Sequence, residues 1–93
     1  MKNQTSVSFQ TSCGLLQKLV DTAERKSREN LKQFGGRLVL IEGGGYEKIW
    51  LETQPMGGEM YAKRNLEAGI NNQLLFMENQ RADGRIPGSV ACE

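Results

Sequence analysis

Residues 12–34 read SCGLLQKLVDTAERKSRENLKQF, and their apolar side chains recur every three or four positions. This spacing predicts an amphipathic helix, because side chains three and four residues apart lie on the same face of a helix. Thr11 or Ser12 can cap its start. Gly35 and Gly36 can supply the positive φ angles with which helices commonly end. The apolar residues are Leu15, Leu16, Leu19, Val20, Ala23, Leu31 and Phe34.

A second helix is predicted over residues 65–81. Asn65 is a favourable N-cap residue, and apolar residues follow it at helical spacing. Amides on this segment are more numerous than solubility requires, so they either face water or pack against an element that this chain does not contain. The apolar residues are Leu66, Ile70, Leu74 and Met77, and the amides are Asn71, Asn72, Gln73, Asn79 and Gln80.

Between the helices, residues 35–64 are expected to form a glycine- and aromatic-rich loop with short strands. The apolar, β-branched run at 37–41 is typical of a buried strand. A hairpin pairing 38–41 with 46–50 is one possible arrangement, although two strands alone are only marginally stable in water.

Residues 82–93 are expected to form a turn and a tail, because Pro87 and Gly88 prevent continuation of the helix. The predicted fold class is therefore mainly α, a helical hairpin with a short β segment. Residues 1–93 are expected to form a single partial domain.

Composition excludes several kinds of chemistry. The 93 residues include no His, so a Ser-His-Asp or Cys-His nucleophile and a His-ligated zinc site are ruled out. Twelve Lys and Arg against 11 Asp and Glu leave a net charge of +1, which disfavours nucleic acid as a partner. No cofactor and no metal ion is expected.

The sequence favours a cytoplasmic protein with no membrane partner. Cys13 and Cys92 lie near opposite ends without a CxxC spacing, which fits a reducing compartment. Residues 1–12 lack the apolar region of a signal peptide. The chain also lacks a run of about 18 apolar residues that could span a bilayer.

The run Gly43, Gly44, Gly45 suggests a phosphate-binding loop, but its context argues against one. A Walker loop requires Gly-Lys-Ser/Thr at the start of a helix, whereas a strand is predicted to follow here. A flexible turn is the preferred interpretation.

Residues 46–61 combine the only Trp, both Tyr, three Glu, two Gly and a Pro. Proteins bind sugars with this mixture, because aromatic faces stack on C–H surfaces while carboxylates and amides bind hydroxyl groups. The alternative is that Trp50 and Tyr61 are ordinary core aromatics. Glycoside cleavage usually needs two facing carboxylates, and each candidate is more often a plain surface residue. The candidates are Glu42, Glu47, Glu52, Glu59 and Asp83.

Residues 42–64 (EGGGYEKIWLETQPMGGEMYAKR), with Asn72-Gln73, Phe76-Met77, Gln80-Arg81 and the run DGRIPG at 83–88, carry a family resemblance. They resemble the N-terminal region of bacterial six-hairpin glycosidase-like proteins, which are (α/α)6-barrel carbohydrate enzymes. The resemblance is close over residues 42–90 and loose over the first helix. It implies that this chain is a fragment of an (α/α)6 toroid, truncated after its opening hairpin, and that carbohydrate is its partner.

The resemblance also implies roles for individual residues. Trp50 would be a stacking platform, and Glu52 and Gln54 would bind sugar hydroxyls. Asp83 and Arg85 would make supporting or rim contacts, and Tyr61 or Arg64 would support the loop. The general acid and base of the family mostly come from later hairpins, so no residue here is given a catalytic role.

The expected function is thus part of a sugar-binding site in a glycosidase-like hydrolase, inactive alone. A non-catalytic carbohydrate-binding module or a helix-mediated interaction module is the alternative. Two helices cannot enclose all their apolar residues, so exposed apolar faces and self-association are expected. The residues concerned are Leu15, Leu19, Phe34, Ile70, Leu74 and Phe76.

Overall fold

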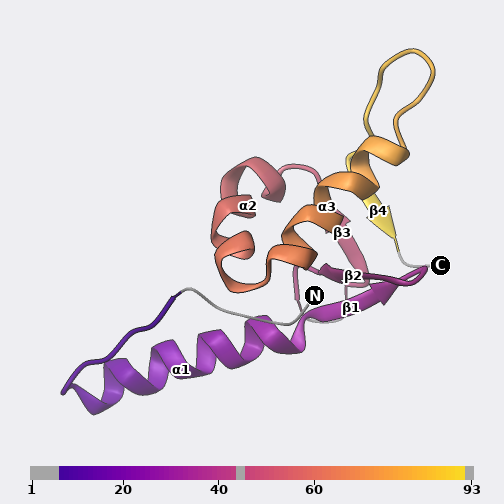
Figure 1. Ribbon diagram of the computed structural model, residues 1–93. Coiled ribbons are helices and arrows are strands. Elements are labelled where there is room, and N and C mark those ends of the chain that lie inside the picture. Colours follow the sequence, from indigo (N-terminus) through magenta and orange to yellow (C-terminus); the bar gives the residue numbers. More distant parts are fainter. Residues whose placement is uncertain (1–6, 44–45, 92–93) are drawn as a thin grey trace.

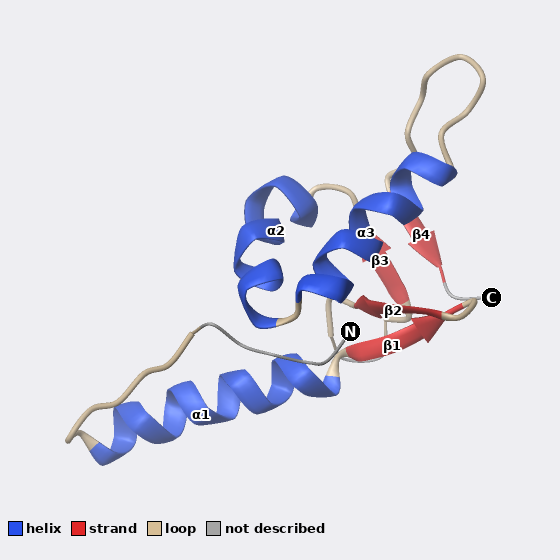
Figure 2. Ribbon diagram, viewed as in Figure 1, coloured by secondary structure: helices blue, strands red, loops and turns tan. Residues whose placement is uncertain are grey.

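The computed structural model describes residues 7–43 and 46–91, which form three helices and two antiparallel pairs of strands (Figures 1 and 2). The fold is mixed α/β, with about 49% helix, rather than mainly α. In chain order the elements are α1 (Gly14–Glu29), β1 (Leu31–Phe34), β2 (Arg37–Leu40), β3 (Lys48–Trp50), α2 (Thr53–Arg64), α3 (Leu66–Glu78) and β4 (Ser89–Ala91). Gly44, Gly45 and Cys92 lie outside the described residues.

The first predicted helix is too long at its C-terminal end, because residues 31–34 form β1 instead. β1 pairs with β2, and only Gly35 and Gly36 separate them. Their φ angles of 56° and 89° match a type I′ turn, which connects two strands in two residues and requires positive φ at both. The two glycines therefore turn a hairpin and do not end a helix.

The expected hairpin between residues 38–41 and 46–50 is wrong as well. β3 pairs with β4, with Ile49 opposite Val90, and between the described residues on either side of the glycine run the only β-bridge joins Gly43 and Tyr46. β4 lies within the predicted tail. It supplies β3 with the partner strand that the sequence did not reveal.

Helix α2 occupies part of the predicted loop. Pro55 is its third residue, where a backbone N–H has no partner within the helix, so the proline is tolerated. Gly57 and Gly58 lower the helix propensity of the segment, and this obscured the helix in the sequence. The helix packs against α3, where a Cβ atom added to Gly69 would lie 3.1 Å from the Cα atom of Ala62.

Helix α3 begins as predicted, because the side chain of Asn65 accepts a hydrogen bond from the backbone N–H of Ala68. It ends at Glu78, three residues before the predicted end. There the amide of Asn79 donates to the carbonyl of Leu75 at 2.7 Å. The Asn79 side chain thus donates a hydrogen bond to one of the last carbonyl groups of the helix.

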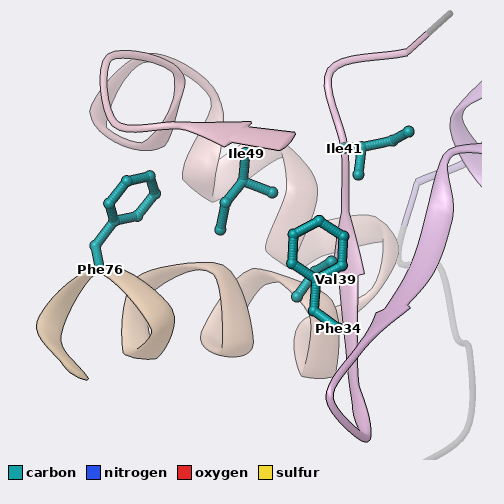
Figure 3. Close-up of a cluster of buried hydrophobic side chains, with 5 residues drawn as sticks. All are labelled: Phe34, Val39, Ile41, Ile49 and Phe76. Atoms are coloured by element: carbon teal, nitrogen blue, oxygen red, sulfur yellow. The ribbon is translucent and has the colours of Figure 1, made fainter. Parts of the chain in front are cut away.

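The core lies between α3 and the two strand pairs. Figure 3 shows its five buried members, Phe34, Val39, Ile41, Ile49 and Phe76. The expected exposure of Phe34 and Phe76 is therefore wrong, because β1, β2 and β3 complete a core that two helices alone would lack. Leu74 is half-buried.

Helix α1 extends away from this core (Figure 1), and none of its residues is buried. The exposed fraction is 81% for Leu15 and 64% for Leu19, and Ile70 on α3 is exposed too. The prediction of exposed apolar helix faces is confirmed for these three residues. Within the described part of the chain, no helix is long and apolar enough to cross a membrane.

Candidate functional site

The hydrogen-bonding pattern of β1 and β2 leaves one edge of β2 without a partner strand. The backbone N–H of Ile41 donates to the carbonyl of Asn30 at 2.9 Å, so these two residues form a hydrogen-bonded pair. Successive residue pairs of an antiparallel ladder alternate between hydrogen-bonded and non-hydrogen-bonded. The N–H and carbonyl groups of Leu38 and Leu40 therefore point away from β1. Buried groups of this kind need another partner.

Two adjacent amides of α3 supply that partner, and we call Asn71 and Asn72 the amide clamp. The side chain of Asn72 accepts from the N–H of Leu40 at 3.1 Å and donates to its carbonyl at 3.0 Å. Asn71 donates to the carbonyl of Leu38 at 2.8 Å. Asn72 is 0% exposed. These two amides of the amide-rich surface thus pack against β2 of the same chain, and not against a missing element.

The same device occurs at β3. The N–H of Leu51 donates to the carbonyl of Gly88 at 2.9 Å, so the backbone groups of Trp50 point away from β4. The carboxylate of Glu42 accepts from the N–H of Trp50 at 3.2 Å. The amide of Gln54 donates to the carbonyl of Trp50 at 2.8 Å. We call Glu42 and Gln54 the Trp50 clamp.

The side chain of Trp50 itself faces solvent and is 41% exposed, so it is not a sealed core aromatic. Lys48 places its Nζ atom 5.8 Å from the centre of the Trp50 ring, within the range of a cation–π interaction. Tyr46 is exposed too, and Ile49 is completely buried. Alternating residues of this extended segment therefore present two aromatic rings and an ammonium group to solvent.

The predicted site residues Glu52 and Gln54 lie shortly after Trp50 in the chain, but only Glu52 is accessible to solvent. Glu52 is exposed just before α2 begins. Gln54 is 3% exposed, and its Oε1 atom is buried without a hydrogen-bond partner. Its side chain is turned toward the Trp50 backbone, so the structure places Gln54 beneath the aromatic residue and not at the surface where a sugar would bind.

Asp83 and Arg85 lie in the loop between α3 and β4, which projects away from the rest of the chain (Figure 1). Asp83 accepts from the backbone N–H of Arg85 at 3.1 Å and pairs with Arg81 at 3.2 Å. Both predicted residues are exposed, and these contacts stay within the loop. Only the base of the loop, at Gly88, is hydrogen-bonded beside Trp50.

Tyr61 lies two turns along α2 from Gln54 and borders a cavity of about 90 Å³ between α1 and α2. Arg64 at the rim of this cavity forms a bidentate ion pair with Glu24, in which Nη2 donates to Oε1 at 2.7 Å and Nε donates to Oε2 at 3.0 Å. Burial, and secondarily the negative charge of Glu42, raises the pKa of Tyr61. The cavity is lined by Glu24, Ser27, Arg28, Leu31, Leu40, Tyr61, Arg64 and Asn65.

From the sequence, Glu42 is only one of five candidate carboxylates, each more often a plain surface residue, and Lys48 has no predicted role. The contact between Glu42 and Trp50 joins residues eight positions apart, one between β2 and β3 and the other in β3, and no sequence spacing signals it. The contact of Gln54 with the Trp50 carbonyl spans four residues, the spacing of one helical turn.

Comparisons with models of protein families, with curated proteins and with solved structures find no match for this chain. In residues 7–43 and 46–91, no three Cys, Asp or Glu side chains lie close enough together to hold a metal ion. The geometry of the Trp50 region is therefore the main structural guide to function.

Proposed function

We propose that this chain contributes part of the sugar-binding site of a carbohydrate-active hydrolase of the six-hairpin glycosidase-like kind, and that it is inactive alone. In this proposal its helices belong to one sector of an (α/α)6 toroid. The observation that carries the proposal is an exposed tryptophan, Trp50, whose backbone N–H and carbonyl are both bound by the Trp50 clamp.

The chemistry of the surrounding surface supports a sugar as the ligand. An indole ring offers a flat apolar face for the C–H surface of a sugar, and the exposed carboxylate of Glu52 can accept hydrogen bonds from its hydroxyl groups. Asp83 and Arg85 would contribute rim contacts from the projecting loop. Gln54 and Tyr61 would support the site from within, since neither is exposed.

The test is a titration with monosaccharides and oligosaccharides, followed by the fluorescence of Trp50 and by calorimetry. Trp50 is the only tryptophan, so its emission reports this site alone. We expect sugar to change the emission, and Trp50→Ala to abolish the heat of binding. Phe9→Ala is the matched control, because Phe9 is 42% exposed but belongs to the segment before α1. Absence of any sugar response, or an equal loss with Phe9→Ala, would refute the proposal.

Catalysis is tested separately with aryl glycosides. We expect the purified 93-residue chain to release no aryl alcohol, since the resemblance places the general acid and base outside this sequence. Hydrolysis that depends on Glu52 would overturn the claim that the chain is inactive alone.

A helix-mediated interaction module is a second candidate, and the exposed apolar face of α1 favours it. Leu15, Leu16 and Leu19 are each at least 42% exposed, and Leu66, Ile70 and Met77 are exposed on α3. Association through these faces, of two copies or with another helix, would be lost in Leu19→Asp or Ile70→Asp. Sedimentation velocity measures this association, and the sugar titration is repeated on the same variants. Under the first candidate, sugar binding at Trp50 should survive Leu19→Asp.

A further inference from the structure

We infer that Glu42 is a positioning residue that fixes the orientation of Trp50 by joining the end of β3 to the start of α2. The claim about orientation stands on contacts within the chain. Its consequence for sugar affinity rests on the function proposed above.

One carboxylate makes both connections. Its Oε1 atom accepts from the N–H of Trp50 at 3.2 Å, and its Oε2 atom accepts from the hydroxyl of Thr53 at 2.9 Å. Trp50 is the last residue of β3, and Thr53 is the first of α2. The two oxygens of Glu42 therefore span the junction between the two elements, on which the direction of the indole ring depends.

Only a carboxylate fits this arrangement fully. It offers two oxygen acceptors, whereas the amide of glutamine offers one oxygen and a donor group. Hydrogen bonds to an ionised acceptor are also stronger than those between neutral groups. The carboxylate also lies close enough to Tyr61 for its charge to act on that residue, so it is held between α2 and the strand.

The exposure of Trp50 distinguishes positioning from simple packing. In the amide clamp, the completely buried Asn72 binds the backbone of the buried Leu40, whereas Glu42 and Gln54 hold the backbone of a residue that is 41% exposed. Two polar side chains, one from the segment after β2 and one from α2, thus hold the backbone of a residue whose ring is partly exposed. A group that is already held in its bound orientation loses less conformational entropy on binding, so the affinity is higher.

The test uses the time-resolved fluorescence anisotropy of Trp50 in the full chain, without sugar. We expect Glu42→Ala to increase the fast local motion of the ring while the far-ultraviolet circular dichroism stays unchanged. Glu47→Ala is the matched control, because Glu47 is an exposed glutamate of the same segment. Glu42→Gln should give an intermediate result, since it keeps one acceptor.

A second pair of variants covers the case in which Glu42→Ala does not fold. Thr53→Val removes only the contact to Oε2 and should increase the motion of the ring, whereas Thr53→Ser keeps the hydroxyl and should restore the original value. Unchanged anisotropy in folded Glu42→Ala, or in Thr53→Val if Glu42→Ala is unfolded, would overturn the inference. An equal change in Glu47→Ala would do the same.

Sugar titration of the same variants then separates the two proposals. We expect Glu42→Ala to weaken sugar binding about tenfold, as loss of preorganisation does. If the unaltered chain binds no sugar, the proposed function fails, while the anisotropy still decides whether Glu42 orients Trp50.

Discussion

Polar side chains bind the backbone groups at the outer edges of both β2 and β3, but the two edges differ in their exposure to solvent. At β2, Asn72 of the amide clamp is 0% exposed and pairs both backbone groups of the buried Leu40. At β3, the Trp50 clamp pairs the backbone of a residue whose ring faces solvent. An unpaired backbone group is costly only where water cannot replace the lost partner. The first clamp should therefore govern stability, and the second should govern orientation.

The largest effect is expected for Asn72→Leu. This change keeps a similar volume but leaves the N–H and the carbonyl of Leu40 buried without partners, at about 1–3 kcal/mol for each group. We expect the free energy of unfolding to fall by about 2–4 kcal/mol, measured by urea denaturation. Asn71→Leu, which removes one half-buried contact, is the control and should cost about 1 kcal/mol. Equal losses in the two variants would show that the burial of Asn72 is not what matters.

Gly69→Val is expected to act next most strongly, by forcing apart the helices that carry the two clamps. An added Cβ would already lie 3.1–3.2 Å from backbone and side-chain atoms of Ala62. Overpacking of this kind costs about 1–3 kcal/mol. In the control Gly58→Ala, the nearest atom is the flexible end of Gln73, so stability should stay constant or rise by up to about 1 kcal/mol through helix propensity. Both are measured by thermal and urea unfolding.

A smaller effect is expected for Gln54→Leu, although Gln54 is almost as buried as Asn72. The change removes the partner of the Trp50 carbonyl, but it also removes an Oε1 atom that is buried without a partner. These contributions oppose one another, so the free energy of unfolding should fall by less than about 1 kcal/mol. A loss as large as that of Asn72→Leu would contradict the distinction between the clamps. Fluorescence anisotropy should nevertheless show a more mobile Trp50.

The sequence predicted the features that depend on local periodicity. The helical spacing of Leu15 and Leu19, and the N-cap at Asn65, identified α1 and the start of α3 correctly. It failed where pairing partners are distant, because β4 is about 40 residues from β3 and its three residues carry no strong pattern. The signal for the first hairpin was present in Gly35 and Gly36, but the same residues also fit a helix end.

The candidate site was predictable in its composition but not in its arrangement. The unusual concentration of aromatic and acidic residues singled out Trp50, which is exposed in the structure. The same reasoning treated Gln54 as a ligand, since nothing in the sequence shows that its side chain turns inward. Nor does the sequence show that the loop carrying Asp83 and Arg85 projects away from the rest of the chain.

The smallest predicted effect concerns Tyr61, which connects the Trp50 clamp to pH. Burial and then the charge of Glu42 raise the pKa of Tyr61 above the ordinary value of 10.0. As the pH rises above 10.0, the unfolded chain therefore loses this proton before the folded chain does, and the free energy of unfolding falls. Well below that pH both states keep the proton, and Tyr61 contributes no pH dependence.

Two variants isolate this contribution. Tyr61→Phe should remove it, so that urea unfolding on either side of pH 10.0 gives a smaller alkaline loss than in the unaltered chain. Glu42→Gln removes only the secondary cause, so it should lower the pKa of Tyr61 in part, as followed by tyrosinate absorbance in a Tyr46→Phe background. If Glu42→Gln instead removed most of the rise in the pKa of Tyr61, the charge of Glu42, rather than burial, would be its main cause.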